Sequence, residues 1–237
     1  HYGTHSFPTR RSSDLPYVLQ EKDEVELNAR AAGLAEGNIA ANGYLHRVLT
    51  LCGLGVSFTG MSNHGSMGEH QISHYIDCFA GENHPGTLHG QQVGVATLTM
   101  ARLQRHYLNS DKPPVIKPTR IDPADMARRM GADIARQCFD EIQPKIFDER
   151  GAAEMNEKFA ELWPVLREEL EAFAMPVAEM ERLLSEARGP MTAGDLGLPV
   201  DNYREAVIHC REMRNRYSFL DIAADEGLLA DFAAREV

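Results

Sequence analysis

Apolar residues recur every three or four positions from Glu21 onward, and runs that alternate apolar and polar residues are nearly absent. This spacing places apolar side chains on one face of an α-helix, whereas a half-buried strand requires alternation. The one short β-branched run, Val115-Ile116, is flanked by prolines, which cannot donate to a sheet. The sequence therefore predicts an all-α fold.

Glycine and proline signals divide the chain into predicted helices and loops. Three prolines within 112–118 predict an extended connector, because proline restricts both its own backbone and that of the preceding residue. Asp122 before a proline is typical of a helix start, and Thr192 followed by Asp195 indicates a capping box before a short turn. The apolar run 48–56 indicates a largely buried helix. The expected helices cover 24–34, 38–54, 67–79, 91–106, a segment from 122, 147–173, 177–187, 202–216 and 219–234, with a loop over 81–86.

The first fifteen residues do not share the periodicity that follows them. The segment around Arg10-Arg11-Ser12-Ser13 is basic and polar, and it resembles translated sequencing-adapter sequence. We therefore expect residues 1–15 to be a foreign segment outside the fold. Residues 16–237 are expected to form one all-helical metal-binding catalytic domain, the C-terminal fragment of a longer protein.

The composition limits the classes of partner and compartment. A net charge of −11 argues against a nucleic-acid or anionic-membrane partner, because binding to either is driven by positive charge. No apolar run reaches the length of about 18 residues that a membrane-spanning helix needs. Cys52, Cys78, Cys138 and Cys210 are widely spaced and are expected to be reduced, mostly buried thiols. Together these features predict a cytoplasmic protein.

Histidines are concentrated in one short part of the sequence. Five of the ten lie within 26 residues, at positions 64, 70, 74, 84 and 89. His70 and His74 would share one face of a helix, and imidazole is the commonest protein ligand of divalent transition metals. In zinc proteases of the H-E-x-x-H type the glutamate lies between the histidines, whereas Glu69 precedes His70 here. The cluster predicts a metal-dependent enzyme other than a zinc protease, with a solvated or core histidine pair as the alternative.

A catalytic metal site typically uses three protein ligands and keeps one position open, where the ion acts as a Lewis acid on a hydroxyl or carbonyl oxygen. That chemistry fits alcohol oxidation or carbonyl reduction with a hydride-transferring cofactor. The sequence contains no G-x-G-x-x-G after a predicted strand and no glycine-rich phosphate loop. The nucleotide platform of such an enzyme is therefore not expected within this chain.

Two histidine motifs and the last part of the chain carry a family resemblance. The run Gly68-Glu69-His70-Gln71-Ile72-Ser73-His74 resembles the G-S-E-H-x-I-S-H segment of sn-glycerol-1-phosphate dehydrogenases. Residues 88–98, Leu-His-Gly-Gln-Gln-Val-Gly-Val-Ala-Thr-Leu, are similar to the H-G-E-x-V-G-V-G-T-L of the same family, and residues 203–229 resemble its C-terminal tail. That family belongs to the superfamily of iron-containing alcohol dehydrogenases, glycerol dehydrogenases and dehydroquinate synthases.

The resemblance implies an all-helical C-terminal domain of the dehydroquinate synthase-like fold, behind a Rossmann-like domain that binds NAD(P). It implies a divalent zinc, nickel or iron ion held by one aspartate and two histidines. By position, His70 and His89 correspond to the histidine ligands and His74 to a catalytic histidine near the substrate. Exchange of the roles of His70 and His74 is the alternative. The substrate would be a small polyol phosphate or ketone phosphate, and the intact enzyme would be a homo-oligomer.

Three departures from the family pattern affect the expected site. Residues 62–67, Ser-Asn-His-Gly-Ser-Met, differ from the usual S-R-P-A-S-G and lack its arginine, which leaves the source of phosphate recognition open. Gln91 replaces the usual glutamate after His-Gly. The family's aspartate ligand lies upstream of the first histidine motif, and Asp14 and Asp23 stand in the wrong sequence context to replace it. This chain is therefore expected to hold half of the metal site and to be inactive alone.

The leading functional hypothesis is the metal-binding domain of an NAD(P)-dependent dehydrogenase that interconverts dihydroxyacetone phosphate and sn-glycerol 1-phosphate. A glycerol dehydrogenase-like enzyme, or another iron-containing alcohol dehydrogenase, is the alternative within the superfamily. A helical metal-binding module without catalysis is the alternative of a different class. His64, His84, His106 and His209 have no counterpart in the motifs and are expected to be surface, cleft-edge or helix-face residues.

Overall fold

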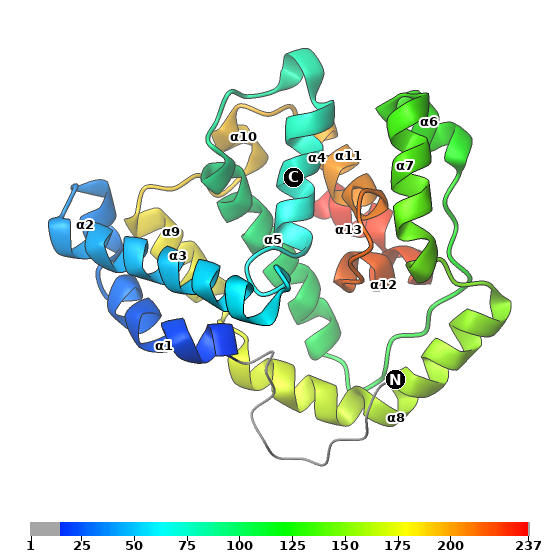
Figure 1. Cartoon of the computed structure of the whole chain (residues 1–237), viewed down its shortest axis with the longest axis horizontal. Coiled ribbons are helices and arrows are strands. Elements are labelled where there is room, and N and C mark those ends of the chain that lie inside the picture. The colour runs from blue at the N-terminus through cyan, green and yellow to red at the C-terminus, as the bar shows by residue number, and fades with distance from the viewer. Residues whose placement is uncertain (1–14, 237) are drawn as a thin grey trace. The chain divides into compact units, whose positions relative to one another are not determined.

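A computed structural model describes residues 15–236, and in that range it contains helices and loops without a β-strand (Figure 1). The all-α prediction is therefore confirmed. Leu15 begins the first helix, and the rest of the expected foreign segment lies outside the described residues. No helix within residues 15–236 is both long enough and apolar enough to cross a membrane.

The described residues form two compact units, which we treat separately. Unit 1 runs to Met67 and includes Glu186–Arg188, and unit 2 consists of Gly68–Ser185 with the residues from Gly189 onward. The helices of unit 1 are α1 (Leu15–Asn28), α2 (Ala31–Ala35) and α3 (Ile39–Thr59). The elements of unit 2 are α4 (Gly68–Phe79), η2 (Gly81–Asn83), α5 (His89–Leu108), α6 (Pro123–Met130), α7 (Ala132–Ile142), η3 (Gln143–Lys145), α8 (Glu149–Phe173), α9 (Val177–Glu186), α10 (Ala193–Leu196), α11 (Val200–His209), η4 (Cys210–Glu212), α12 (Phe219–Glu226) and α13 (Leu229–Arg235), where η marks a 3-10 turn.

Helix α3 is far more exposed than its apolar sequence indicates. Its buried residues are Ala41 and Gly55, whereas Leu49 and Phe58 are 62% and 66% exposed. Helices α1 and α2 pack against α3 but are too short to cover it on all sides. The prediction of a largely buried helix over 48–56 is therefore wrong.

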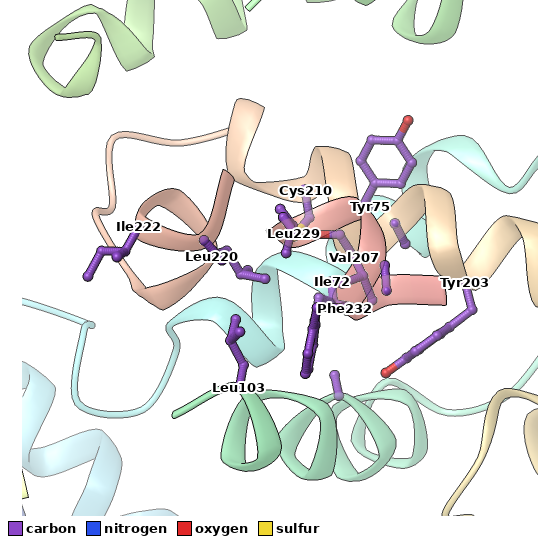
Figure 2. Packing of buried hydrophobic residues seen from close by; sticks show 14 of the residues in the cluster. Ile72, Tyr75, Leu103, Tyr203, Val207, Cys210, Leu220, Ile222, Leu229 and Phe232 are labelled. Atoms are coloured by element: carbon purple, nitrogen blue, oxygen red, sulfur yellow. Dashed lines mark hydrogen bonds between the residues drawn. The ribbon is translucent and has the colours of Figure 1, made fainter. Parts of the chain in front are cut away.

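The hydrophobic core of unit 2 lies where α4, α5, α11, α12 and α13 meet (Figure 2). It is formed by side chains from these helices and η4, among them Ile72, Tyr75, Leu103, Tyr203, Val207, Cys210, Leu220, Ile222, Leu229 and Phe232. Burial of one large aliphatic side chain contributes about 1.5–3 kcal/mol. Because Ile72 and Ile76 fix one face of α4 in this core, the positions of His70 and His74 on the other side of the helix are fixed as well.

Side-chain caps define several helix starts in unit 2. Asp122 accepts a hydrogen bond at the start of α6, and Thr192 forms a capping box with Asp195 at α10, as predicted. A further capping box joins Ser218 and Asp221 at the start of α12. These caps satisfy backbone N–H groups that the first helical turn leaves without partners.

Three predicted helices are interrupted in the structure, and the first of them, 24–34, divides between α1 and α2 at a turn over residues 29 and 30. The segment 202–216 is helical as α11 to His209 and continues as the short turn η4 and a loop. The buried ammonium group of Lys145 accounts for this change, because it donates to the carbonyl oxygens of Arg211 (2.5 Å) and Arg216 (3.3 Å), which therefore do not serve as acceptors in a continued helix. The segment 219–234 divides into α12 and α13 at Gly227, whose φ of 88° ends α12.

The four cysteines are free thiols in the described structure. Cys210 is buried, Cys52 and Cys138 are half-buried, and Cys78 is exposed. The expectation of mostly buried thiols therefore holds fully for Cys210 alone. Burial raises the pKa of this thiol well above its usual range, as expected for an unreactive core cysteine.

Candidate metal centre

Three histidines predicted to form the site lie together in unit 2. His70 and His74 are one turn apart on α4, and His89 is the first residue of α5, which packs against α4. The centroid of the His89 ring is 5.1 Å from those of His70 and His74, and the His70 and His74 centroids are 6.1 Å apart. Two histidine motifs separated in sequence thus converge on one place.

Local sequence explains why α4 and α5 begin at these positions. A Cβ atom at Gly68 would lie 2.6 Å from Cε of Met100 and 3.3 Å from Cδ1 of Leu220, so the glycine permits α4 to start close to α5 and α12. The side chain of Gln91 accepts a hydrogen bond from the Leu88 backbone N–H at 3.0 Å, which fixes the start of α5 at His89. Gln91, which replaces the usual glutamate of the resembling family, can therefore still perform this helix-start role.

The ligand atoms that come closest together belong to His74, Asp77 and His89. One ligand atom from each of these residues lies within 4.8 Å of the other two. His70 is not part of this group, although its ring contacts that of His89. Its Nδ1 atom is buried without a hydrogen-bond partner, and Oε1 of Glu69 is 3.4 Å from it. The geometry therefore favours His74 over His70 as the second histidine ligand.

A chain of hydrogen bonds determines the protonation of the His89 ring. The Ser73 hydroxyl donates to Oε1 of Gln92 at 2.8 Å, so its oxygen can accept from Nδ1–H of His89 at 2.8 Å. The Nδ1-protonated tautomer leaves a lone pair on Nε2. Ser73 and Gln92 are both buried, whereas the His89 side chain is 43% exposed. His89 is thus prepared to bind a metal through Nε2, with Ser73 as its supporting partner.

A second set of hydrogen bonds holds Asp77 in its charged form. Its Oδ1 atom accepts from Nε2 of Gln92 at 3.0 Å and from Nε2 of His84 at 3.0 Å. His84 is assigned as the donor because its Nδ1 accepts from the backbone N–H of Gly86 at 3.1 Å. Burial alone would raise the pKa of Asp77, but the hydrogen bonds from His84 and Gln92 outweigh it, and the pKa lies below its ordinary value. The carboxylate is therefore charged near neutral pH.

The two histidines on α4 are held in the neutral form that binds metals. Burial lowers the pKa of His74, and the positive charge of Arg214 lowers it further. Burial also lowers the pKa of His70, where Glu69 opposes the shift and His89, Arg216 and Arg214 add to it. A neutral imidazole presents a nitrogen lone pair, whereas a protonated one repels a cation.

These lowered pKa values predict a pH dependence of stability in the metal-free chain. An unfolded histidine takes up a proton near pH 6.5, whereas folded His70 and His74 resist protonation until lower pH. Between these pH values the unfolded state binds more protons, so the free energy of unfolding falls as the pH is lowered below about 6.5. Urea unfolding in the presence of a chelator measures this fall. The His70→Gln, His74→Gln double variant should show a shallower fall, and an unchanged slope would contradict the prediction.

Sequence reasoning missed the supporting residues of the site. Asp77 lies three positions after His74 on the same helix face, which is a usable signal, but no role was assigned to it. Ser73, Gln92 and the contact of His84 with Asp77 depend on how α4 meets α5 and have no signal in the sequence. The expectation of a surface or cleft-edge position for His84 agrees with its half-buried side chain, 31% exposed.

Three further histidines of the described residues, His64, His106 and His209, lie outside this cluster. His64 belongs to unit 1, where its Nε2 is 2.6 Å from the hydroxyl of Thr59. In the last turn of α5, His106 contacts the ring of Tyr107 edge to face. At the end of α11, Nδ1 of His209 is 2.8 Å from Oε1 of Glu212. The ring contact of His106 and the ion contact of His209 are typical of helix-face residues.

Comparison with known proteins adds no family assignment. No protein-family model matches the chain, and no curated protein matches it. We therefore infer the function from the chemistry of the site and from the motif resemblance.

Proposed function

We propose that this chain is the metal-binding part of an NAD(P)-dependent oxidoreductase that acts on the CH–OH group of a small polyol or its ketone. In the leading form of the proposal the enzyme interconverts sn-glycerol 1-phosphate and dihydroxyacetone phosphate. The observation that carries it is the convergence of His74, Asp77 and His89, with His89 held by Ser73 in the tautomer that binds metals. A metal-binding histidine typically donates its other ring N–H to a supporting acceptor, as His89 can to Ser73.

The donor set fits a divalent transition metal. Two imidazole nitrogens and one carboxylate oxygen suit zinc, iron or nickel, and calcium or magnesium would require oxygen ligands almost exclusively. His74, Asp77 and His89 would hold the ion. When bound, the ion would supply Lewis-acid polarisation of the substrate oxygen.

The residues around this donor set have separate tasks in the proposed reaction. Ser73 and Gln92 hold His89 in one tautomer, and Gln92 and His84 orient the carboxylate of Asp77. His70 is neutral and contacts the His89 ring, and we assign it the exchange of a proton with the substrate hydroxyl. NAD(P) would bind to another part of the intact enzyme, because the motifs of this chain include no glycine-rich nucleotide loop.

Cobalt substitution tests this proposal without requiring turnover. Co²⁺ takes the ligands that Zn²⁺ takes, and its visible absorption depends on the coordination number and on the ligands. We expect the chain to bind one Co²⁺ ion and its absorption to change when dihydroxyacetone phosphate or sn-glycerol 1-phosphate is added. A change with glycerol but none with its phosphate would favour the glycerol dehydrogenase-like alternative. Cobalt binding without a response to any polyol would favour a non-catalytic metal module, and absence of cobalt binding would contradict the proposal.

The support given by Ser73 to His89 can be tested separately. Ser73→Ala removes the acceptor that fixes the Nδ1-protonated tautomer of His89. Loss of a supporting partner of this kind lowers metal affinity by about 10–100-fold, and we expect this range for zinc. Calorimetric titration of zinc into the two proteins measures the change. Thr97→Ser, near the middle of α5, is a control for a small change at a hydroxyl-bearing residue and should bind zinc as the parent chain does. Equal zinc affinities of Ser73→Ala and the parent chain would contradict the role assigned to Ser73.

A further inference from the structure

Exposed apolar side chains follow α3, the longest helix of unit 1 (Figure 1). Ile39, Leu49, Leu54 and Phe58 on this helix, and Met61 just after it, are between 44% and 90% exposed. A single exposed apolar side chain needs no explanation, but several along one helix form a patch that a binding partner can cover. We call these five residues the α3 patch.

Unit 1 has little hydrophobic core of its own. The buried apolar side chains among its described residues are Ala31 and Ala41, and the core cluster shown in Figure 2 is built from unit 2. Two alanines bury too little apolar surface to offset the conformational entropy that is lost when three helices become ordered. The folded form of unit 1 therefore requires a further apolar surface against the α3 patch.

Two glycines inside α3 have no local structural reason. Gly43 and Gly53 are exposed, and a Cβ atom at either position would meet no atom within 4 Å. Glycine is unfavourable inside a helix relative to alanine, because it loses more backbone freedom on folding. At a contact between two helices, however, a missing side chain leaves a gap that a large side chain of the other helix can fill. These glycines therefore favour another helix as the element that covers the α3 patch.

The charge distribution favours a second copy of the chain as the partner. The sequence contains 35 acidic residues, but α3 contains none, and its one arginine, Arg47, is paired with Asp23 at 2.9 Å. Two molecules that each carry a net charge of −11 repel each other where their acidic surfaces meet. An uncharged helix is a surface on which two copies can meet without this repulsion. The same helix offers no charge to attract a strongly basic or acidic partner.

The apolar area of the α3 patch agrees with the requirement of a dimer. Side chains of this size and exposure present on the order of 500 Å² of apolar surface in each chain. Two copies would then bury about 1,000 Å² in total, which is the area at which a specific interface becomes stable. A contact of this kind between identical faces has two-fold symmetry.

We propose that α3 forms a dimer interface by packing antiparallel against α3 of a second copy of the chain. With the two-fold axis between Thr50 and Leu51, Phe58 of each copy lies opposite Gly43 of the other, so the largest side chain of the α3 patch meets a gap. Thr50 is exposed and lies next to its own counterpart at the axis. The inference rests on unit 1 alone and is independent of the metal centre and of the proposed function.

Sedimentation equilibrium of the full chain tests the inference, with a chelator present so that a metal ion cannot join two molecules. We expect the parent chain to form a dimer. Thr50→Glu and Thr50→Lys should each weaken the dimer by more than about tenfold, because each places two like charges together at the axis. An equimolar mixture of the two variants should restore the dimer, since opposite charges then meet there. Phe58→Ala should also weaken it by more than about tenfold.

Matched controls separate the position of the charge from its other effects. Thr50→Gln has the size of the glutamate variant without its charge and should form a dimer as the parent chain does. Ala153→Glu adds the same charge at an exposed position of α8 in unit 2 and should leave the dimer unchanged. A parent chain that stays monomeric, a dimer that persists in both charged Thr50 variants, or an equal loss in Ala153→Glu would overturn the inference. Failure of the mixed charged variants to associate would overturn it as well, even if each variant alone had lost the structure of unit 1.

Discussion

Replacement of His89 by alanine should remove specific zinc binding. His89 is the first residue of α5, and both possible ligand sets include it, whereas their other histidine comes from α4. Changes in supporting residues already cost about 10–100-fold in affinity, and we expect loss of this ligand to cost more than about 100-fold. Calorimetric titration of zinc into the parent chain and His89→Ala at neutral pH measures the effect. His106→Ala, at the other end of α5, is the matched control and should bind zinc as the parent chain does.

The same titration distinguishes the two possible ligand sets. If His74, Asp77 and His89 hold the ion, His74→Ala and Asp77→Asn should each approach the loss seen for His89→Ala, and His70→Ala should lose less than tenfold. If the assignment from the motif resemblance is correct, His70→Ala should lose most and His74→Ala should retain most of the affinity. Equal zinc affinities of His89→Ala and the parent chain would contradict both assignments. Gln92 donates to Asp77 and also supports His89 through Ser73, so this chain of hydrogen bonds joins two ligands of the first set.

The sequence predicted which histidines meet but not how their atoms are arranged. The four-residue spacing of His70 and His74 predicts a shared helix face, and the structure has their ring centroids 6.1 Å apart. That His89 lies close to these two histidines was predicted from the motif resemblance, and the periodicity of the sequence did not indicate it. Which nitrogen is free to bind a metal depends on Ser73 and Gln92, whose contacts arise only when α4 and α5 pack together. Such contacts between helices have no local sequence signal.

Features of the fold that depend on neighbouring residues in the sequence were predicted correctly, whereas features that depend on residues far apart in the sequence were predicted less well. The caps at Asp122 and Thr192 follow from short-range hydrogen bonds and are present as predicted. The end of α11 at His209 depends on Lys145, which lies more than sixty positions away in the sequence. The exposure of α3 was mispredicted for a related reason, because apolar composition indicates burial only when neighbouring elements are long enough to supply it. Tertiary contacts thus overrode periodicity at these two places.

Replacement of Lys145 by alanine should destabilise unit 2 more than any surface substitution. Its ammonium is 4% exposed and is shared by the Asp221 carboxylate and the carbonyl oxygens of Arg211 and Arg216. Removing it leaves the buried Asp221 carboxylate with a longer contact of 3.6 Å to Arg211 as its remaining ion pair, and breaking a buried pair typically costs about 3–5 kcal/mol. Urea unfolding followed by far-ultraviolet circular dichroism measures this loss. Arg136→Ala removes an ion pair whose arginine and aspartate side chains are 71% and 86% exposed, and we expect it to cost less than about 1 kcal/mol.

A second variant separates the charge of Lys145 from its volume. Lys145→Met keeps most of the side chain but cannot donate to Asp221 or to the loop carbonyls, so it should be nearly as unstable as Lys145→Ala. A stability of Lys145→Met close to that of the parent chain would show that packing, and not the ion pair, fixes the loop. The zinc affinity of the folded Lys145→Met chain should change little, since His74, Asp77 and His89 are positioned by α4 and α5 and do not contact this loop through any hydrogen bond in the described residues. The loop and the metal centre would then be shown to be built by separate sets of contacts within unit 2.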